Sequence, residues 1–180
     1  KMRRGSIKPF NKVYADILKD PYYADEHIKE ADESFLLKTG NCYVFKIKEQ
    51  LHPAITGNSP FYGQATAKSS IGRVDVIARL IVDGMQEYEK FIPDRVKEST
   101  GQMFLEITPI TFDVKVKEDI TLSQLRFCNG DFDDSIIRDE KFISSILNLS
   151  HPKDNVATLS VNVSNFAIAD NVKAAAYCAK

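Results

Sequence analysis

Short runs in which apolar and polar residues alternate constrain the fold of this sequence more than any other feature. In TFDVKVK, residues 111–117, Phe112, Val114 and Val116 would share one side of an extended strand, and the polar residues between them the other. Other strand-like runs are SFLLKTGNCYVFKIKEQL at 34–51, FYGQATA at 61–67, RVDVIARLIVDG at 73–84 and MFLEITP at 103–109. Many short strands at regular spacing, with Gly and Pro turns, predict an all-β, mainly antiparallel barrel or sandwich with a few short helices.

The chain divides into three parts that differ in their pattern of polar and apolar residues. Residues 1–33 are polar and irregular, residues 34–128 hold the strand-like runs and form the expected β core, and residues 129–180 follow it. The elements predicted outside the core are a short helix at 11–20, a helix at 134–150 and a last strand at 158–166. Because helices do not alternate with the strands, a doubly wound α/β fold does not fit.

Composition narrows the class of protein. The 180 residues are 43% hydrophobic, with a net charge of −1, so no overall field favours a nucleic acid polymer or an anionic membrane. No apolar run approaches the length of a membrane span. Three widely spaced cysteines fit a reducing compartment, and we expect a cytoplasmic protein. The three histidines are isolated and there is no Cys-x-x-Cys pair, so we expect no metal-ligating residues and no zinc.

The stretch AKSSIGR, residues 67–73, is a candidate anion-binding turn. Ser69 or Ser70 could cap a single helical turn, whose free amides and hydroxyls would form an anion cradle. Lys68 and Arg73 add positive charge on either side, and a guanidinium makes directional bonds to phosphate or carboxylate. Taken alone, the stretch fits a capped surface turn better than a binding site.

Two polar residues lie in the strands further along the chain. Glu106 sits between the apolar residues of MFLEITP, where it is either an outward-facing strand residue or a buried carboxylate that needs a partner. A buried Glu106 beside Arg73 would suit general acid–base chemistry. Gln124 in LSQLRF could bond a ligand, but taken alone it fits the solvated polar face of a strand better.

Together these segments resemble dCTP deaminase of the dUTPase-like superfamily. The match is to KSSxGRxD at residues 68–75 and to LEIxPxxFxVxVxxxxxLxQLRF at 105–127, and it is good over roughly 34–127. The closer match is the long bacterial form, in which two dUTPase-like halves lie in one chain. The resemblance implies a dUTPase-like β-barrel or β-clip fold, and residues 129–180 would then lead toward a second half.

The resemblance also implies an activity and site roles. The reaction would be hydrolysis of a C–N bond of a cyclic amidine, which converts dCTP to dUTP and ammonia without zinc. Mg²⁺ would accompany the triphosphate, and a trimer or a pseudo-trimer with the second half would carry the sites. By position, Glu106 matches the residue that activates water, with Arg73 and Ser69 beside it. Lys68, Ser70 and Gln124 match nucleotide-binding positions.

The sequence also departs from the family pattern. The segment between Arg73 and Glu106 lacks the HxxAxxIDPGxxG signature of single-half deaminases and dUTPases. In the long form that signature lies in the second half, so the resemblance implies that these residues alone are an incomplete enzyme. Two alternatives therefore stay open: a dUTP diphosphatase or bifunctional deaminase–diphosphatase, and a non-catalytic dUTPase-like nucleotide-binding domain.

Overall fold

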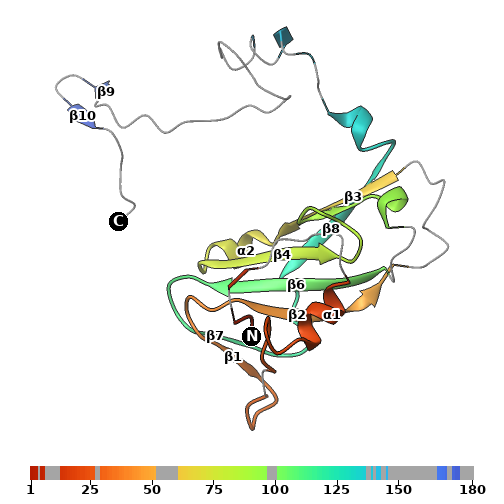
Figure 1. Cartoon of the computed structure of the whole chain (residues 1–180). Coiled ribbons are helices and arrows are strands. Elements are labelled where there is room, and N and C mark those ends of the chain that lie inside the picture. The colour runs from red at the N-terminus through yellow and green to blue at the C-terminus, as the bar shows by residue number, and fades with distance from the viewer. Residues whose placement is uncertain are drawn as a thin grey trace. The chain divides into compact units, whose positions relative to one another are not determined.

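The structure is a computed structural model that describes residues 1–3, 5–6, 13–26, 29–51, 61–96, 101–136, 139, 141–142, 145, 166–169 and 172–174. The chain forms two compact units, Lys1–Ser135 and Ile136–Lys180. In the second unit, strands β9 (Phe166–Ala169) and β10 (Val172–Ala174) pair antiparallel. All other elements named below belong to the first unit (Figure 1).

The largest sheet of the first unit is built around strand β6 (Gln102–Pro109). Strands β2 (Tyr43–Gln50) and β4 (Val76–Val82) flank it, and both run antiparallel to it. In the register of this sheet, Glu106 faces Val44 of β2 and Arg79 of β4. Glu106 is therefore placed in the middle strand, with a charged residue directly across on one side.

Two smaller sheets complete the described part of this unit. One has the order β5–β3–β8 and the other pairs β1 with β7, all antiparallel. Their strands are β5 (Lys90–Phe91), β3 (Phe61–Ala67), β8 (Ser123–Asn129), β1 (Phe35–Leu37) and β7 (Val114–Val116). The short helices are α1 (Tyr14–Lys19), α2 (Ser69–Gly72) and the 3-10 turns η2 (Pro93–Arg95) and η3 (Asp133–Ser135). The expected mainly antiparallel β architecture is confirmed.

Apolar side chains cover both faces of the central sheet. On one face, Leu105 and Ile107 of β6 join a core with Val76 and Ala78 of β4, and Met103 joins a second core beside it. On the other face, Phe104 and Ile81 pack with residues of α1 and the N-terminal segment, including Met2, Tyr14 and Ile17. Because successive strand residues alternate between faces, Glu106 lies on the same face as Phe104, under α1 and the N-terminus.

Most local predictions are confirmed where the structure describes the chain. The run at 34–51 forms β1 and β2, and the predicted N-terminal helix is α1. The alternation in residues 111–117 is only partly realised, because Val116 is buried but Phe112 is 50% exposed and lies before β7. Most of the helix predicted at 134–150, and all but the last residue of the strand predicted at 158–166, fall outside the described residues.

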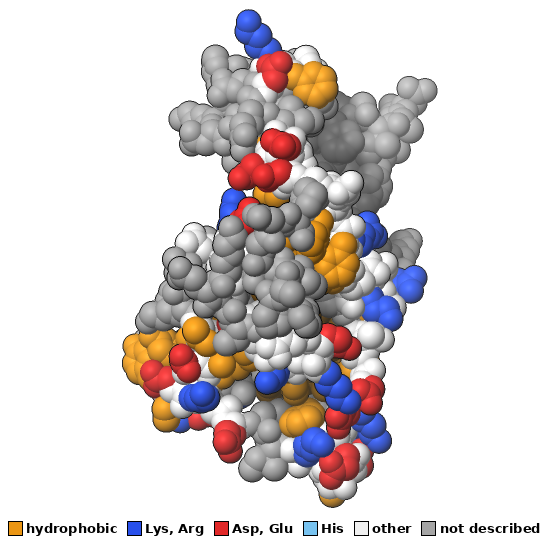
Figure 2. Space-filling view, turned by 90° about the vertical axis from the view of Figure 1, so that its right-hand side faces the viewer, with side chains coloured by type: hydrophobic (Ala, Val, Ile, Leu, Met, Phe, Trp, Pro, Cys, Tyr) orange, Lys and Arg blue, Asp and Glu red, His pale blue; other side chains and the backbone are white. Residues whose placement is uncertain are grey.

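Surface charge follows the balanced composition. On the face shown in Figure 2, basic and acidic side chains are mixed rather than gathered into patches of one sign. Ion pairs such as Lys48 with Glu118 and Asp119 join opposite charges on the surface. Among the described residues, no helix has both the length and the apolar character needed to cross a bilayer.

Candidate functional site

Glu106 is a charged residue in the interior of the central sheet. Its side chain is 1% exposed, on the face that α1 and the N-terminal segment cover. A carboxylate removed from water in this way needs charge partners and hydrogen-bond donors. Of the two interpretations that the sequence leaves open for Glu106, the structure supports the buried one.

Arg79 supplies the positive charge. It lies directly opposite Glu106 in the β4–β6 register, and its Nε and Nη2 atoms donate to Oε1 of Glu106 at 3.1 and 2.5 Å. Its side chain is 36% exposed, so the guanidinium reaches from the partly exposed surface into the buried carboxylate. Charge-assisted bonds of this kind are stronger than bonds between neutral groups.

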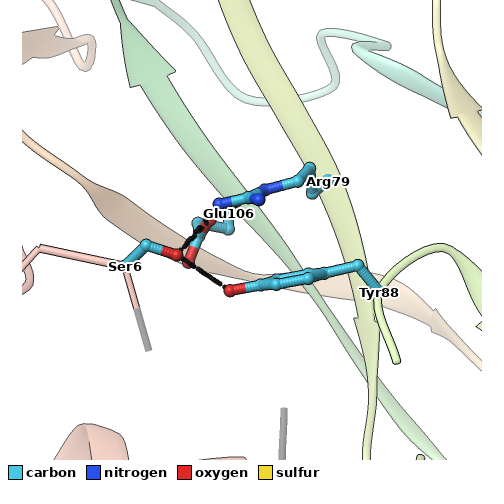
Figure 3. Close-up of polar contacts among 4 residues, drawn as sticks. All are labelled: Ser6, Arg79, Tyr88 and Glu106. Carbon is cyan, nitrogen blue, oxygen red and sulfur yellow. Dashed lines mark hydrogen bonds and ion pairs between the residues drawn. The ribbon is translucent and has the colours of Figure 1, made fainter. Parts of the chain in front are cut away.

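Two hydroxyl groups also contact Glu106 (Figure 3). The Oγ atom of Ser6 lies 3.0 and 2.9 Å from the two carboxylate oxygens, and the Tyr88 hydroxyl donates to Oε2 at 3.2 Å. Ser6 Oγ and Tyr88 OH are 2.8 Å apart, and Arg79 Nη2 donates to Ser6 Oγ at 2.9 Å. The Arg79 guanidinium also lies over the Tyr88 ring, 4.1 Å from its centroid. Ser6, Arg79, Tyr88 and Glu106 are called the Glu106 network below.

The electrostatics of the network favour the protonated forms of the groups around Glu106. Burial raises the pKa of Tyr88 and the charge of Glu106 adds to it, while the bond from Ser6 opposes the shift. Burial opposes the charge of Arg79, yet the hydrogen bond and charge of Glu106 leave its pKa raised. Burial and the Glu106 charge raise the pKa of the Cys42 thiol to about 12. Tyr88 therefore stays a donor and Arg79 a cation at neutral pH.

The AKSSIGR stretch forms α2 and its flanks at the surface. Lys68 is the N-cap residue, and no side chain caps this helix, so the expected serine cap is wrong. The backbone of Lys68 accepts bonds from Ile71 and Gly72, which closes the turn without the serine hydroxyls. Ser69, Ser70 and Arg73 are exposed, and Lys68 is half-buried.

Gln124 lies close to this turn. It pairs with Thr66 in the β3–β8 register, and its Nε2 donates to Thr66 Oγ1 at 3.2 Å. The Lys68 amide donates to the Leu122 carbonyl at 3.0 Å, which ties the turn to the segment before β8. The structure thus brings Gln124 into the neighbourhood of the predicted phosphate-side residues.

Glu106 and the turn lie on opposite faces of the central sheet. Ile71 of α2 packs against the core that contains Leu105 and Ile107, whereas the Glu106 side chain points to the other face. Within the described residues, the predicted contact between Arg73 and Glu106 does not form, and Arg79 takes that place instead. One chain therefore holds two separate groups of candidate residues.

Three residues of the network were not predicted from the sequence. Arg79 carried a signal, because it is the only charged residue in the apolar run VIARLIV. Ser6 and Tyr88 carried none, since Ser6 is 100 residues from Glu106 in the sequence and reaches it only through the fold.

Comparisons with known proteins bear on both groups. The family model for the 2'-deoxycytidine 5'-triphosphate deaminase N-terminal domain matches residues 15–131. The structure is similar to the crystal structure of 2'-deoxycytidine 5'-triphosphate deaminase from Agrobacterium tumefaciens, with a TM-score of 0.58 and 24% identity. That match covers 93% of this chain but 47% of the other, so this chain spans about half the length of that protein. Among curated protein sequences, none matches significantly. The similarity in structure confirms the expected dUTPase-like β fold.

Proposed function

Because the chain belongs to the family of dCTP deaminase N-terminal domains, we propose that it is part of an enzyme that converts dCTP and water to dUTP and ammonia. The observation that carries this proposal is that the matched residues 15–131 contain both the exposed KSSIGR turn and the buried, ion-paired Glu106. An ionised carboxylate with fixed oxygens is the group that metal-free activation of water requires.

The proposed chemistry assigns one proton acceptor and one electrophile. Glu106 accepts a proton from water as the water oxygen forms a bond with C4 of the cytosine ring, and the electron pair of the C4=N3 double bond moves to N3. The C4=N3 bond then re-forms as the bond between C4 and the exocyclic nitrogen breaks, and the proton held by Glu106 passes to the departing amine, which leaves as ammonia. The proton that remains on the new oxygen moves to N3, which gives the uracil ring. Atoms and charge balance, and no redox change occurs.

We assign the turn to substrate binding. Lys68, Ser69, Ser70 and Arg73 are exposed or half-exposed and offer cationic and hydroxyl groups to a triphosphate, which would arrive as its Mg²⁺ complex. Gln124 lies next to them and can bond the nucleotide. These residues are more useful to an anionic ligand than to the fold, since no side-chain bond of theirs caps α2.

The separation of the two groups implies that a complete site needs more than one copy of this fold. Glu106 faces the α1 side of the sheet and the turn faces the other. We propose that Glu106 of one fold meets the turn of another, in a trimer or in a pseudo-trimer with a second half. This arrangement reconciles the sequence resemblance with the distance between the residues in one chain.

The activity test compares two products from two nucleotides. Protein that carries the flanking sequence of the reading frame is incubated with Mg²⁺ and dCTP, and ammonia is measured; pyrophosphate is measured with dUTP. Ammonia from dCTP is expected, and Glu106→Gln should bind dCTP but release no ammonia. Pyrophosphate from dUTP without ammonia from dCTP would show that the protein is a diphosphatase. If neither product forms, the remaining hypothesis is a non-catalytic nucleotide-binding domain.

A mixing experiment tests the shared site. Glu106→Gln and Arg73→Ala are each expected to be inactive, because each lacks one half of every site. After the two variants are mixed and allowed to exchange subunits, sites that combine an intact Glu106 with an intact Arg73 should restore part of the ammonia release. No recovery, in protein shown to have exchanged subunits, would refute a site that spans two chains.

A further inference from the structure

Among the described residues, the Ser6 hydroxyl makes hydrogen bonds with three groups of the Glu106 network. It lies 3.0 and 2.9 Å from the Glu106 oxygens, 2.8 Å from Tyr88 OH and 2.9 Å from Arg79 Nη2. A serine hydroxyl has one proton to donate and two lone pairs to accept with. It can donate to the carboxylate and accept from Arg79, and the single proton of Tyr88 goes either to Ser6 Oγ or to Glu106 Oε2.

A water molecule in the same place would have the same bonds available. It would donate one proton to Glu106 and accept a bond from Arg79, while the one Tyr88 proton is donated to Glu106 Oε2, so the water keeps one lone pair for the bond to C4. A general base must lie within about 2.6–3.2 Å of the group whose proton it takes, and the Ser6 oxygen meets this condition for both oxygens of Glu106.

We propose that Ser6 Oγ occupies the position of the attacking water, in a site that Arg79 and Tyr88 complete as positioning residues and that Ser6 blocks. This inference rests on the proposed deaminase function for the identity of the water as the nucleophile. The site itself, a hydroxyl-sized position between Glu106, Arg79 and Tyr88, rests on the contacts alone.

Arg79 and Tyr88 bond different oxygens of the Glu106 carboxylate. Arg79 bonds Oε1 and Tyr88 bonds Oε2, so the carboxylate is held from both ends while Ser6 Oγ sits between them. The guanidinium over the Tyr88 ring adds a cation–π contact that fixes the two side chains to each other. Each carboxylate oxygen of Glu106 therefore keeps a bond to Arg79 or Tyr88 when the Ser6 hydroxyl is removed.

Ser6 is built to be released more easily than the residues around it. It is exposed, whereas Glu106 is buried and Arg79 and Tyr88 are anchored in or next to the central sheet. Gly5 precedes it with φ +74° and has no atom within 4 Å of where a Cβ would lie, so this backbone has the conformational freedom of glycine and open space around it. The segment before it is held, since the amides of Met2 and Arg3 bond Cys42 and Tyr23.

The test replaces the Ser6 hydroxyl and asks what takes its place. Ser6→Gly and Ser6→Ala remove it, Ser6→Thr keeps it, and Ser135→Ala makes the same chemical change at a serine outside the network. In crystal structures of Ser6→Gly and Ser6→Ala, we expect an ordered water within about 3.2 Å of Glu106, Arg79 and Tyr88. A collapsed network, or a carboxylate turned away with no water between these groups, would overturn the proposal.

The rate of ammonia release in the protein with its flanking sequence gives the second readout. In wild type, water must displace the Ser6 hydroxyl, which costs about the free energy of one net hydrogen bond. Ser6→Gly and Ser6→Ala remove this cost, so kcat/KM should rise by up to about tenfold. Ser6→Thr and Ser135→Ala should not show this rise. Tyr88→Phe should lower kcat with little change in KM, because Tyr88 acts on Glu106 and its water rather than on substrate binding. If wild type is active and Ser6→Ala is less active, the proposal that Ser6 blocks the water position is refuted.

The two readouts separate the two proposals. If neither wild type nor variants release ammonia, the deaminase function fails, and the crystal structures still decide whether Ser6 occupies a water site. If wild type is active but Ser6→Gly holds no water between Glu106, Arg79 and Tyr88, the deaminase function stands and the inference about Ser6 is refuted.

Discussion

Replacing Arg79 by methionine should lower the free energy of unfolding more than the loss of any other partly exposed charged side chain among the described residues. Methionine keeps the length and apolar stem of Arg79 but leaves Glu106, which is 1% exposed, without its cation. Breaking a buried ion pair by removing one partner costs about 3–5 kcal/mol. Ser6 and Tyr88 still donate to Glu106 and Arg79 is 36% exposed, so we expect about 2–3 kcal/mol.

Arg95→Met is the matched control for this change. Arg95 is similarly exposed at 42%, and its bonds to Glu87 and Asp133 are longer, at 3.4 and 3.5 Å. Glu87 is 39% exposed and Asp133 52%, against 1% for Glu106, so the pairs of Arg95 lie nearer to surface pairs, which are worth about 0–1 kcal/mol. The difference between the two variants isolates the effect of burying the carboxylate.

Urea unfolding of a double-mutant cycle measures the coupling. Arg79→Met and Glu106→Gln are made singly and together, and the free energy of unfolding of each is obtained at one pH and salt concentration. The double variant should recover most of the loss, because it buries a neutral amide in place of an unpaired charge. Additive losses, or a cost for Arg79→Met no larger than that for Arg95→Met, would refute the ion-pair argument.

Two further predictions concern a buried thiol and a close backbone approach. Burial, and after it the Glu106 charge, raises the pKa of the Cys42 thiol to about 12, and only a thiolate reacts with an alkylating reagent. Cys42 should therefore be alkylated far more slowly at pH 8 than the half-buried Cys128. Peptide mass spectrometry measures both rates, and equal rates would contradict the prediction. The folded chain binds the Cys42 thiol proton more tightly than the unfolded chain, so its contribution to stability is complete below pH 9.0 and is lost as the pH rises toward about 12, and the urea midpoint should fall across that window. Gly63→Ala should lower the urea unfolding free energy by about 1–3 kcal/mol, because the added Cβ would lie 3.1 Å from Leu125 Cδ1. Gly72→Ala, with nothing within 4 Å, is its control and should change stability by less than about 0.5 kcal/mol.

The sequence by itself determined the strands and the kind of chemistry. The alternation of apolar and polar residues in 34–51 and 61–67 predicted β1, β2 and β3, because every second residue of a strand with one buried face is apolar. The KSSIGR turn and Glu106 were likewise visible as motifs, and the family comparison covers both. Local geometry and residue type are properties of a short segment, so a short segment is enough to predict them.

Only the tertiary structure decided which residues meet. Both faces of β6 are buried, so its residues do not alternate between apolar and polar, and the sequence could not say which face Glu106 occupies. The β4–β6 register set Arg79 rather than Arg73 against it. Ser6 reaches the same carboxylate across 100 residues of sequence, a contact that no local pattern encodes because it depends on where the N-terminal segment packs over the sheet.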